Sequence, residues 1–405
     1  PPERAAGIGG RVVAVPDFAA PLAAAQQGRR AVERADFPGV PQGLVQPHGF
    51  LADDARVAQL EPVVDIAEGR LLGQIEDVLP VAGWWRFPDA APAYVAVTYD
   101  EEGCGDRSAW LPRALADQGV ATTAFVETEA ITPAGVAALR EARSDVHLHW
   151  DRGFLGTEPR MPVRIAGLAA AERRPALTDQ TDRAHALGMG EPGVVLSRVH
   201  GLVFDADPAR TFRILHAAGV EVDSTYGPAG SGRFGYLFGT GLPFRPLDST
   251  GWPFPLLEVP FLFQDDEEWS RELQDRIVRE AATVHHQLVV TVFHVNAMER
   301  KPAAELIEGT LAIGETATAA GAQHGSLLPF VRHWRARLAS PLRTSGDARR
   351  VRVELDAQAD GMAVRVPAVA GARATVDGAE VETVVHGRHL VVPVPRGPHV
   401  VEVRW

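Results

Sequence analysis

The chain has 405 residues, of which 46% are hydrophobic and 23% charged, as in an ordinary globular protein. This length allows a large core and predicts two or three domains, while the formal net charge of −12 argues against a nucleic-acid or anionic-membrane partner. The single cysteine, Cys104, excludes an intrachain disulfide, and no run approaches the roughly 20 apolar residues that span a bilayer.

Residues 1–90 are predicted to form an accessory α/β segment. We expect a short strand within Gly10–Pro16, helices over Ala19–Gln27 and Leu71–Val78, and a proline-broken loop over Phe37–Phe50. The chain starts at Pro1 and not at Met, which trimming or removal of a secretory signal would explain.

An apolar segment that begins at Tyr94 ends abruptly in three carboxylates, Asp100, Glu101 and Glu102, followed by Gly103. Such a run is typical of a strand buried on both faces of a parallel sheet. Active sites of parallel sheets lie at the carboxyl ends of the strands. The three acids therefore indicate either a cation or a catalytic task, with a solvated loop as the alternative.

Strands and helices then alternate along the chain. Further strands are predicted at Ala121–Val126, Ser144–Trp150, Val194–Arg198, Val220–Ser224, Leu256–Phe263 and Leu288–His294. Helices are predicted at Ala109–Gln118, Thr132–Arg140, Arg164–Leu187, Pro208–Ala218, Glu267–His285, Pro302–Ala319 and Ser326–Leu338. The alternation predicts a parallel sheet or a (β/α) barrel over residues 91–340, and the long loop Gly227–Pro255 is predicted to bind ligand.

After Pro341 the period of the apolar residues changes from helical spacing to two. Segments such as Val351–Leu355 and Leu390–Val394 alternate apolar and polar side chains, and turn residues such as Asp377 and Gly378 separate them. Residues 346–405 are therefore predicted to form a small all-β sandwich module.

Polar side chains gather at the predicted strand ends. On the strand Ser144–Trp150, His147 and His149 share one face, and Asp151 continues that row. Further titratable or polar residues end the other strands: Arg198, His200, Asp223, Ser224 and His294. Two imidazoles two residues apart can reach one ion, and imidazole with carboxylate fits zinc or a similar divalent metal.

The segment Thr98–Gly103 resembles the Thr-Phe-Asp-Asp-Gly motif of the polysaccharide deacetylases, the NodB-homology proteins of carbohydrate esterase family four. The order of the later motifs is similar too: a histidine motif, an arginine motif, a strand with aspartate and a strand that ends in histidine. The resemblance covers roughly residues 93–320. It implies a distorted (β/α)7 barrel, metal-dependent removal of an acyl group from an N-acylated sugar, and a secreted or cell-surface protein.

The resemblance also implies roles for single residues. Asp100 would be the general base, Arg198 would orient it, and His294 would be the general acid. Asp223 would belong to the fourth motif. Glu101 and His149 would bind the metal, with His147 as a further ligand.

Two departures from the family pattern affect the metal site. The family has a second histidine four residues after the first, but Gly153 stands there, and Glu101 replaces an aspartate. Either His147 and His149 share the metal, or His200 supplies the second imidazole, or metal binding is lost. The alternatives are a carbohydrate-binding relative without catalysis and a glycoside hydrolase with paired carboxylates, to which Glu258 would contribute.

Overall fold

The computed structural model describes residues 4–8, 11–15, 44–46, 58–76, 81–150, 170–191, 194–228, 233–265, 271–295, 302–347 and 349–405. Three of the predictions, the helix over residues 19–27, most of the loop over residues 37–50 and the position of Asp151, lie outside these residues.

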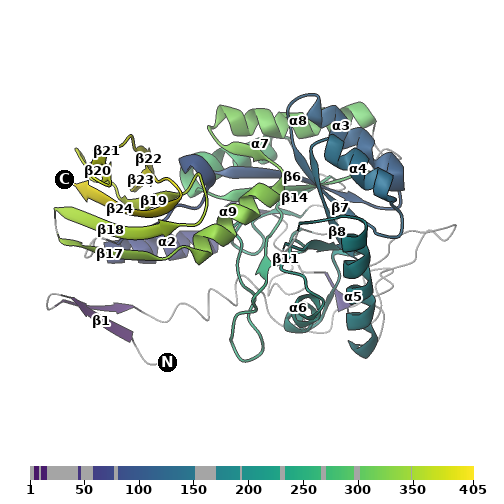
Figure 1. Ribbon diagram of the computed structural model, residues 1–405, viewed down its shortest axis with the longest axis horizontal. Coiled ribbons are helices and arrows are strands. Elements are labelled where there is room, and N and C mark those ends of the chain that lie inside the picture. Colours follow the sequence, from purple (N-terminus) through teal and green to yellow (C-terminus); the bar gives the residue numbers. More distant parts are fainter. Residues whose placement is uncertain are drawn as a thin grey trace.

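A curled parallel sheet forms the centre of the larger lobe (Figure 1). Its strands, in spatial order, are β13 (Leu257–Glu258), β11 (Val222–Asp223), β9 (Leu196–Val199), β8 (Ser144–Trp150), β7 (Thr122–Val126), β6 (Tyr94–Glu101), β15 (Leu288–His294) and β14 (Phe263–Gln264). A further strand, β16 (Gln323–Gly325), pairs with the start of β6. Every residue of β6 is buried, as the uncharged run from Tyr94 to Tyr99 predicts for most of the strand.

The two edge strands β13 and β14 lie on one continuous segment of the chain. At its start the Val259 N–H donates to the Asp223 carbonyl at 2.8 Å. Three residues later the Leu262 N–H donates to the Val290 carbonyl, also at 2.8 Å. The segment therefore connects one edge of the curled sheet to the other. The parallel pairing of the strands confirms the predicted α/β architecture.

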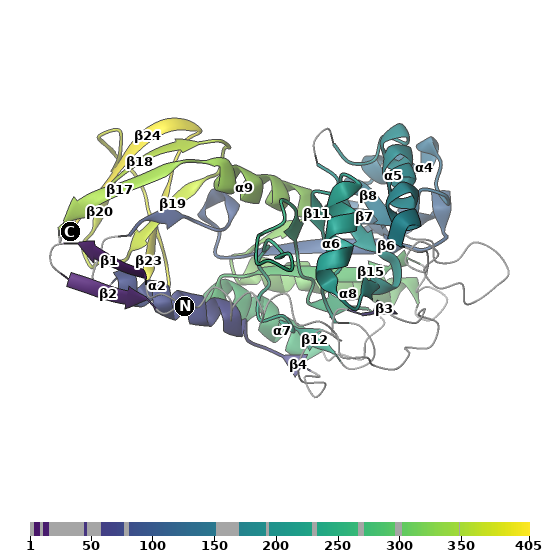
Figure 2. The same ribbon diagram turned by 90° about the horizontal axis from the view of Figure 1, so that it is seen from below.

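Helices cover the outer face of this sheet (Figures 1 and 2). They are α3 (Trp110–Ala116), α4 (Pro133–Glu141), α5 (Ala170–Ala186), α6 (Pro208–Ala217), α7 (Arg271–Glu280), continued by a π-helical turn (Ala281–His285), and α8 (Ala303–Ala319). Thr132 caps α4 as predicted, because its hydroxyl accepts the Gly135 N–H at 3.3 Å. Each of the predicted helices over this region is present among the described residues, and the predicted starts at residues 164–169 and 267–270 lie outside them.

The amino ends of the strands are closed by α9 (Leu327–Ala339) and the short helix η2 (Pro88–Ala90). Phe330 of α9 packs against Tyr94 and Phe87, with ring centroids 5.5 and 6.0 Å apart respectively. The carboxyl ends of the strands are thus the open edge of the sheet.

The C-terminal region forms two antiparallel sheets around a second core (Figure 2). One sheet contains β17 (Leu342–Asp347), β18 (Arg350–Ala357), β24 (Gly397–Arg404), β20 (Arg373–Val376) and β21 (Ala379–Glu380). The other contains β22 (Val384–His386), β23 (His389–Pro393), β19 (Ala363–Pro367) and β5 (Gly83–Trp84). Because β5 precedes the parallel sheet in the chain, the C-terminal sheets are not built from residues 346–405 alone.

Segments of the N-terminal region pair with different parts of the chain. β1 (Arg4–Ile8) pairs with β2 (Arg11–Val15), where a strand was predicted. β3 (Leu44–Val45) pairs with β10 (Phe204–Asp205), and β4 (Ala58–Gln59) with β12 (Phe234–Gly235). The predicted helix over residues 71–78 is the end of a longer one, α2 (Val63–Glu76). No helix in the described ranges is long and apolar enough to cross a membrane.

Candidate metal and catalytic site

The predicted strand-end residues meet at the open edge of the sheet. The register of β6 and β15 places His294 opposite Asp100, and that of β8 and β9 places Arg198 opposite His149. This is the arrangement that the predicted single site at the carboxyl ends of the strands requires.

A buried ion pair joins Asp100 to Arg198. Nη1 of Arg198 lies 2.8 Å from Oδ1 of Asp100, and Arg198 is 0% exposed. The guanidinium also donates to the carbonyl and hydroxyl of Ser224 at 2.7 and 3.1 Å, and stacks over the Phe125 ring at 4.2 Å. These contacts fix the guanidinium, which in turn orients the Asp100 carboxylate.

Glu102, His149 and His200 form a group with the spacing of metal ligands. One ligand atom from each lies within 4.8 Å of the other two. Nδ1 of His149 lies 3.0 Å from the Arg198 carbonyl, and because a carbonyl only accepts, Nδ1 carries the proton. Nε2 of His149 then presents its lone pair, and this buried atom has no protein partner.

The charges in this group suit a cation. Burial lowers the pKa of His149 to about 4, so its ring is neutral, as a metal ligand must be. Although burial alone would raise the pKa of Glu102, His200 and His294 lower it well below its usual range. A carboxylate and two imidazoles are the ligand types that zinc and similar divalent ions bind. The residues therefore fit the metal that the sequence predicts.

His294 is held by an aspartate that the sequence analysis did not identify. Nδ1 of His294 donates to Oδ1 of Asp265 at 2.6 Å, and the His294 backbone N–H donates to Oδ2 at 2.7 Å. Burial alone would lower the pKa of His294, but Asp265 and Glu102 raise it well above its usual value. Asp265 directly follows β14, so the strand-end pattern that identified the other residues applies to it too.

Glu101 faces away from this group. Side chains alternate along β6, so Asp100 and Glu102 share one face while Glu101 lies on the other. Its carboxylate accepts the Gly105 N–H, and burial raises its pKa to about 8. At Gly105 φ is +56°, and a Cβ there would lie 2.3 Å from the Ala130 carbonyl oxygen, so this turn requires glycine.

His147 and Asp223 also lie outside the group. His147 precedes His149 by two residues, or roughly 7 Å along β8, and its ring lies near Phe125 with centroids 6.4 Å apart. Asp223 accepts a hydrogen bond from Ser197 Oγ at 2.7 Å, and burial raises its pKa. The next residue, Ser224, follows β11 directly and is the one that contacts Arg198.

Glu258 also points away from Asp100 and Glu102. Its Oε1 accepts the backbone N–H groups of Thr225 and Tyr226 at 3.1 and 2.8 Å. Burial and the neighbouring Asp223 raise the pKa of Glu258 well above its usual range, so it is a neutral structural acid.

Comparisons with known proteins give only distant likenesses. No family model and no curated protein matches the chain. Solved structures similar to it are polysaccharide deacetylases and esterases of carbohydrate esterase family 4. A candidate polysaccharide deacetylase from Mycobacterium smegmatis is 16% identical over 64% of this chain and 96% of that chain, with a TM-score of 0.42.

A family 4 carbohydrate esterase from Streptomyces lividans is 17% identical over 59% of this chain and 94% of that chain, with a TM-score of 0.34. A family 4 acetyl xylan esterase from Clostridium thermocellum, in complex with a cobalt ion, is 12% identical over 59% and 90% of the two chains, with a TM-score of 0.32.

Proposed function

We propose that this protein is a metal-dependent hydrolase that removes an acyl group from an N-acylated sugar or a related amide. The observation that carries the proposal is the group Glu102, His149 and His200, with ligand atoms within 4.8 Å, at the same sheet edge as Asp100 and His294. In this proposal the curled sheet is the distorted (β/α)7 barrel and the antiparallel sheets are the sandwich module. A polymeric sugar substrate fits the expected secreted or cell-surface location.

The metal ligands are assigned to Glu102, His149 and His200. This assignment replaces Glu101 and His147, which the sequence analysis favoured, because neither belongs to the group. His200 supplies the second imidazole in place of the absent histidine at position 153. When bound, a divalent ion supplies Lewis acidity at the acyl carbonyl and at the attacking water.

Asp100 takes the proton from the attacking water in this proposal. A base must be placed to accept the proton, and the guanidinium of Arg198, 2.8 Å away, holds the Asp100 carboxylate in one orientation. Because Arg198 is itself held by Ser224, the carboxylate cannot turn toward solvent without breaking a buried ion pair.

His294 gives a proton to the departing amine. An amine is a poor leaving group unless it is protonated as the C–N bond breaks. Asp265 accepts from Nδ1, so Nε2 is the nitrogen that faces the site, at 3.7 Å from Glu102. The carboxylates of Asp265 and Glu102 favour the protonated His294 ring, which is the state that a general acid needs.

The test is to compare Asp100→Asn and His294→Ala with the wild type on an N-acetylated chitooligosaccharide. We expect each variant to lower kcat at least ~100-fold, the usual scale for loss of a general acid or base. Metal content, measured by plasma mass spectrometry, should stay at the wild-type level in Asp100→Asn. Wild-type turnover in both variants would refute the assigned roles, and a wild type that binds the sugar without hydrolysing it would favour the binding-protein alternative.

A further inference from the structure

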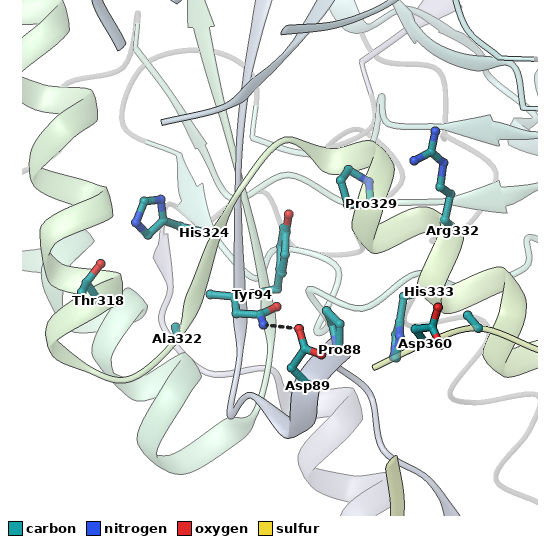
Figure 3. A pocket seen from close by; sticks show the side chains of 12 residues that line it. Pro88, Asp89, Tyr94, Thr318, Ala322, His324, Pro329, Arg332, His333 and Asp360 are labelled. Atoms are coloured by element: carbon teal, nitrogen blue, oxygen red, sulfur yellow. Dashed lines mark hydrogen bonds between the residues drawn. The ribbon is translucent and has the colours of Figure 1, made fainter. Parts of the chain in front are cut away.

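A second pocket lies at the amino ends of β6 and β16, at the end of the sheet opposite the catalytic residues (Figure 3). Its volume of about 780 Å³ is in the range of pockets that bind small ligands. Segments far apart in the sequence line it: η2 with Asp89, β16 with Gln323, α9 with His333, and the turn after β18 with Asp360. The pocket thus lies where the parallel sheet and the C-terminal sheets meet.

His333 is a buried polar side chain on the wall of this pocket, and its ring bonds to the Trp85 backbone. It is 5% exposed, and the contact with Trp85 occupies one of its two ring nitrogens. In Figure 3 its ring lies between Pro88 and Asp360, which also line the pocket. Burial lowers the pKa of His333 to about 4, so the ring is neutral and offers one donor and one acceptor. The donor serves the Trp85 backbone, and leaving the buried acceptor nitrogen unsatisfied is destabilising unless a ligand or water supplies a donor.

Asp89 is held in place on the pocket wall by its neighbours. Gln323 Nε2 donates to its Oδ2 at 3.0 Å, and its own backbone N–H donates to the Gly361 carbonyl at 2.7 Å. Its φ is +51°, a left-handed conformation that residues other than glycine adopt rarely and that often marks a ligand site. The exposed carboxylate of Asp360 is contributed by the C-terminal sheets.

The charges and distances restrict the chemistry of the ligand. Two carboxylates line the pocket, and the guanidinium of Arg332 is already paired with Glu191, its Nε 2.9 Å from Oε2, so an anion is disfavoured. Among the described residues, the group with metal-ligand spacing is Glu102, His149 and His200 at the catalytic edge. The acids and imidazoles of this pocket therefore lie too far apart to hold one metal ion. A neutral ligand rich in hydroxyl groups fits these partners, because hydroxyls donate both to carboxylates and to the acceptor nitrogen of a neutral imidazole.

We propose that this pocket binds a neutral sugar unit, whose hydroxyls donate to Asp89 and Asp360 and hydrogen-bond to His333. The sugar unit belongs to the polymer that is deacylated at the other end of the sheet, and this part of the proposal rests on the proposed function. Two sites on one protein raise the affinity for a polymer, because the first contact increases the effective concentration at the second.

Calorimetric titration of xylohexaose and chitohexaose tests the pocket, with Glu102→Gln as the parent protein to prevent turnover. Asp360→Ala and His333→Gln should each weaken binding of the tighter probe at least ~10-fold, the scale for loss of a hydrogen bond to a charged or buried group. Glu380→Ala, which removes an exposed carboxylate of the same sheets outside the pocket, should bind as the parent does. Asp360 is exposed, so its variant is expected to fold even if His333→Gln does not.

Three results would overturn the proposal: no binding of either probe at millimolar concentration, unchanged binding in Asp360→Ala, or displacement of the probe by inorganic phosphate. Kinetics separate this proposal from the proposed function. Asp360→Ala should raise KM for an acylated polymer but leave kcat/KM unchanged for 4-nitrophenyl acetate. If the probes bind in an Asp360-dependent way while the wild type hydrolyses no acylated sugar, the pocket stands and the proposed function fails.

Discussion

The guanidinium of Arg198 joins several of the strands that meet at the candidate site. It extends from β9, pairs with Asp100 at the end of β6, and donates to Ser224 just after β11. The side chain is 0% exposed and the Asp100 side chain 3% exposed. Removing one member of such a buried pair leaves the other as an uncompensated charge, so the catalytic geometry and the stability of the fold depend on the same contact.

Arg198→Met should therefore lower the free energy of unfolding by about 3–5 kcal/mol, measured by urea denaturation. Arg210→Met is the matched control, since Arg210 is half exposed and pairs with Asp205 at 3.8 Å; its loss should change stability by less than about 1 kcal/mol. Equal, small losses in the two variants would show that the Arg198–Asp100 pair is not the buried contact described.

At the scale of single elements, the alternation of side chains along β6 decides which acids face the site. The sequence predicts this strand and its acidic end, because the run from Tyr94 is uncharged and β-branched. Which of the three acids faces inward depends on how far the strand continues, and strand ends are not determined by composition. Asp265 was missed for a related reason: the predicted strand over residues 256–263 is bent into two short ones, and Asp265 follows the second.

Two neighbouring variants test this alternation. Glu102→Gln should weaken zinc binding at least ~10–100-fold, which is the loss when even a residue that supports a metal ligand is changed. Glu101→Gln should leave zinc binding unchanged, because Glu101 faces Gly105. Isothermal titration with zinc measures both. Loss of affinity in Glu101→Gln alone would return the ligand role to the residue that the sequence analysis favoured.

Helix α2 contributes a buried acid whose titration should appear in the stability of the protein. Burial raises the pKa of Asp65 to about 7, although Arg86 and Thr240 act to lower it. An unfolded aspartate titrates near 3.9, so the folded state retains a proton that the unfolded state releases. This stabilisation is fully present below about pH 4 and is lost as the pH rises through about 7.

Asp65→Asn should remove that pH dependence, which amounts to at most about 4 kcal/mol at roughly 1.4 kcal/mol per pKa unit. The free energy of unfolding of the wild type should fall between pH 5 and pH 8, and that of Asp65→Asn should fall by less. Arg70→Gln, an exposed change on the same helix at a residue that does not shift the pKa of Asp65, should keep the wild-type slope. Identical slopes in Asp65→Asn and the wild type would contradict the assignment.

At the scale of the whole molecule, the C-terminal sheets share a core with the parallel sheet. The sequence predicts their strands, since the change of period after Pro341 is plain, but not their partner from the start of the chain. Trp84 pairs with Val364, and the Trp85 N–H donates to the Ala363 carbonyl at 2.7 Å. A strand of two residues, such as β5, carries no periodicity that sequence analysis could detect.

A chain truncated after Ala339 should therefore be much less stable than the full chain. It exposes Trp84 and Trp85, and we expect its Tm to fall by at least roughly 10 °C, since 1 kcal/mol corresponds to about 2–4 °C in a domain of roughly 150–250 residues. Scanning calorimetry of both chains measures the difference. An unchanged Tm would show that the parallel sheet folds independently of the C-terminal sheets.

The metal content of the wild type and His200→Ala tests the central claim most directly. The residue four positions after His149 is glycine, so a metal site depends on His200 providing the second imidazole. After removal of metals with a chelator and reloading with zinc, we predict one ion per wild-type chain by plasma mass spectrometry. His200→Ala should hold none and should lose deacylation of an N-acetylated chitooligosaccharide. A wild type that deacylates without metal, or a His200→Ala variant that retains both ion and activity, would contradict the account.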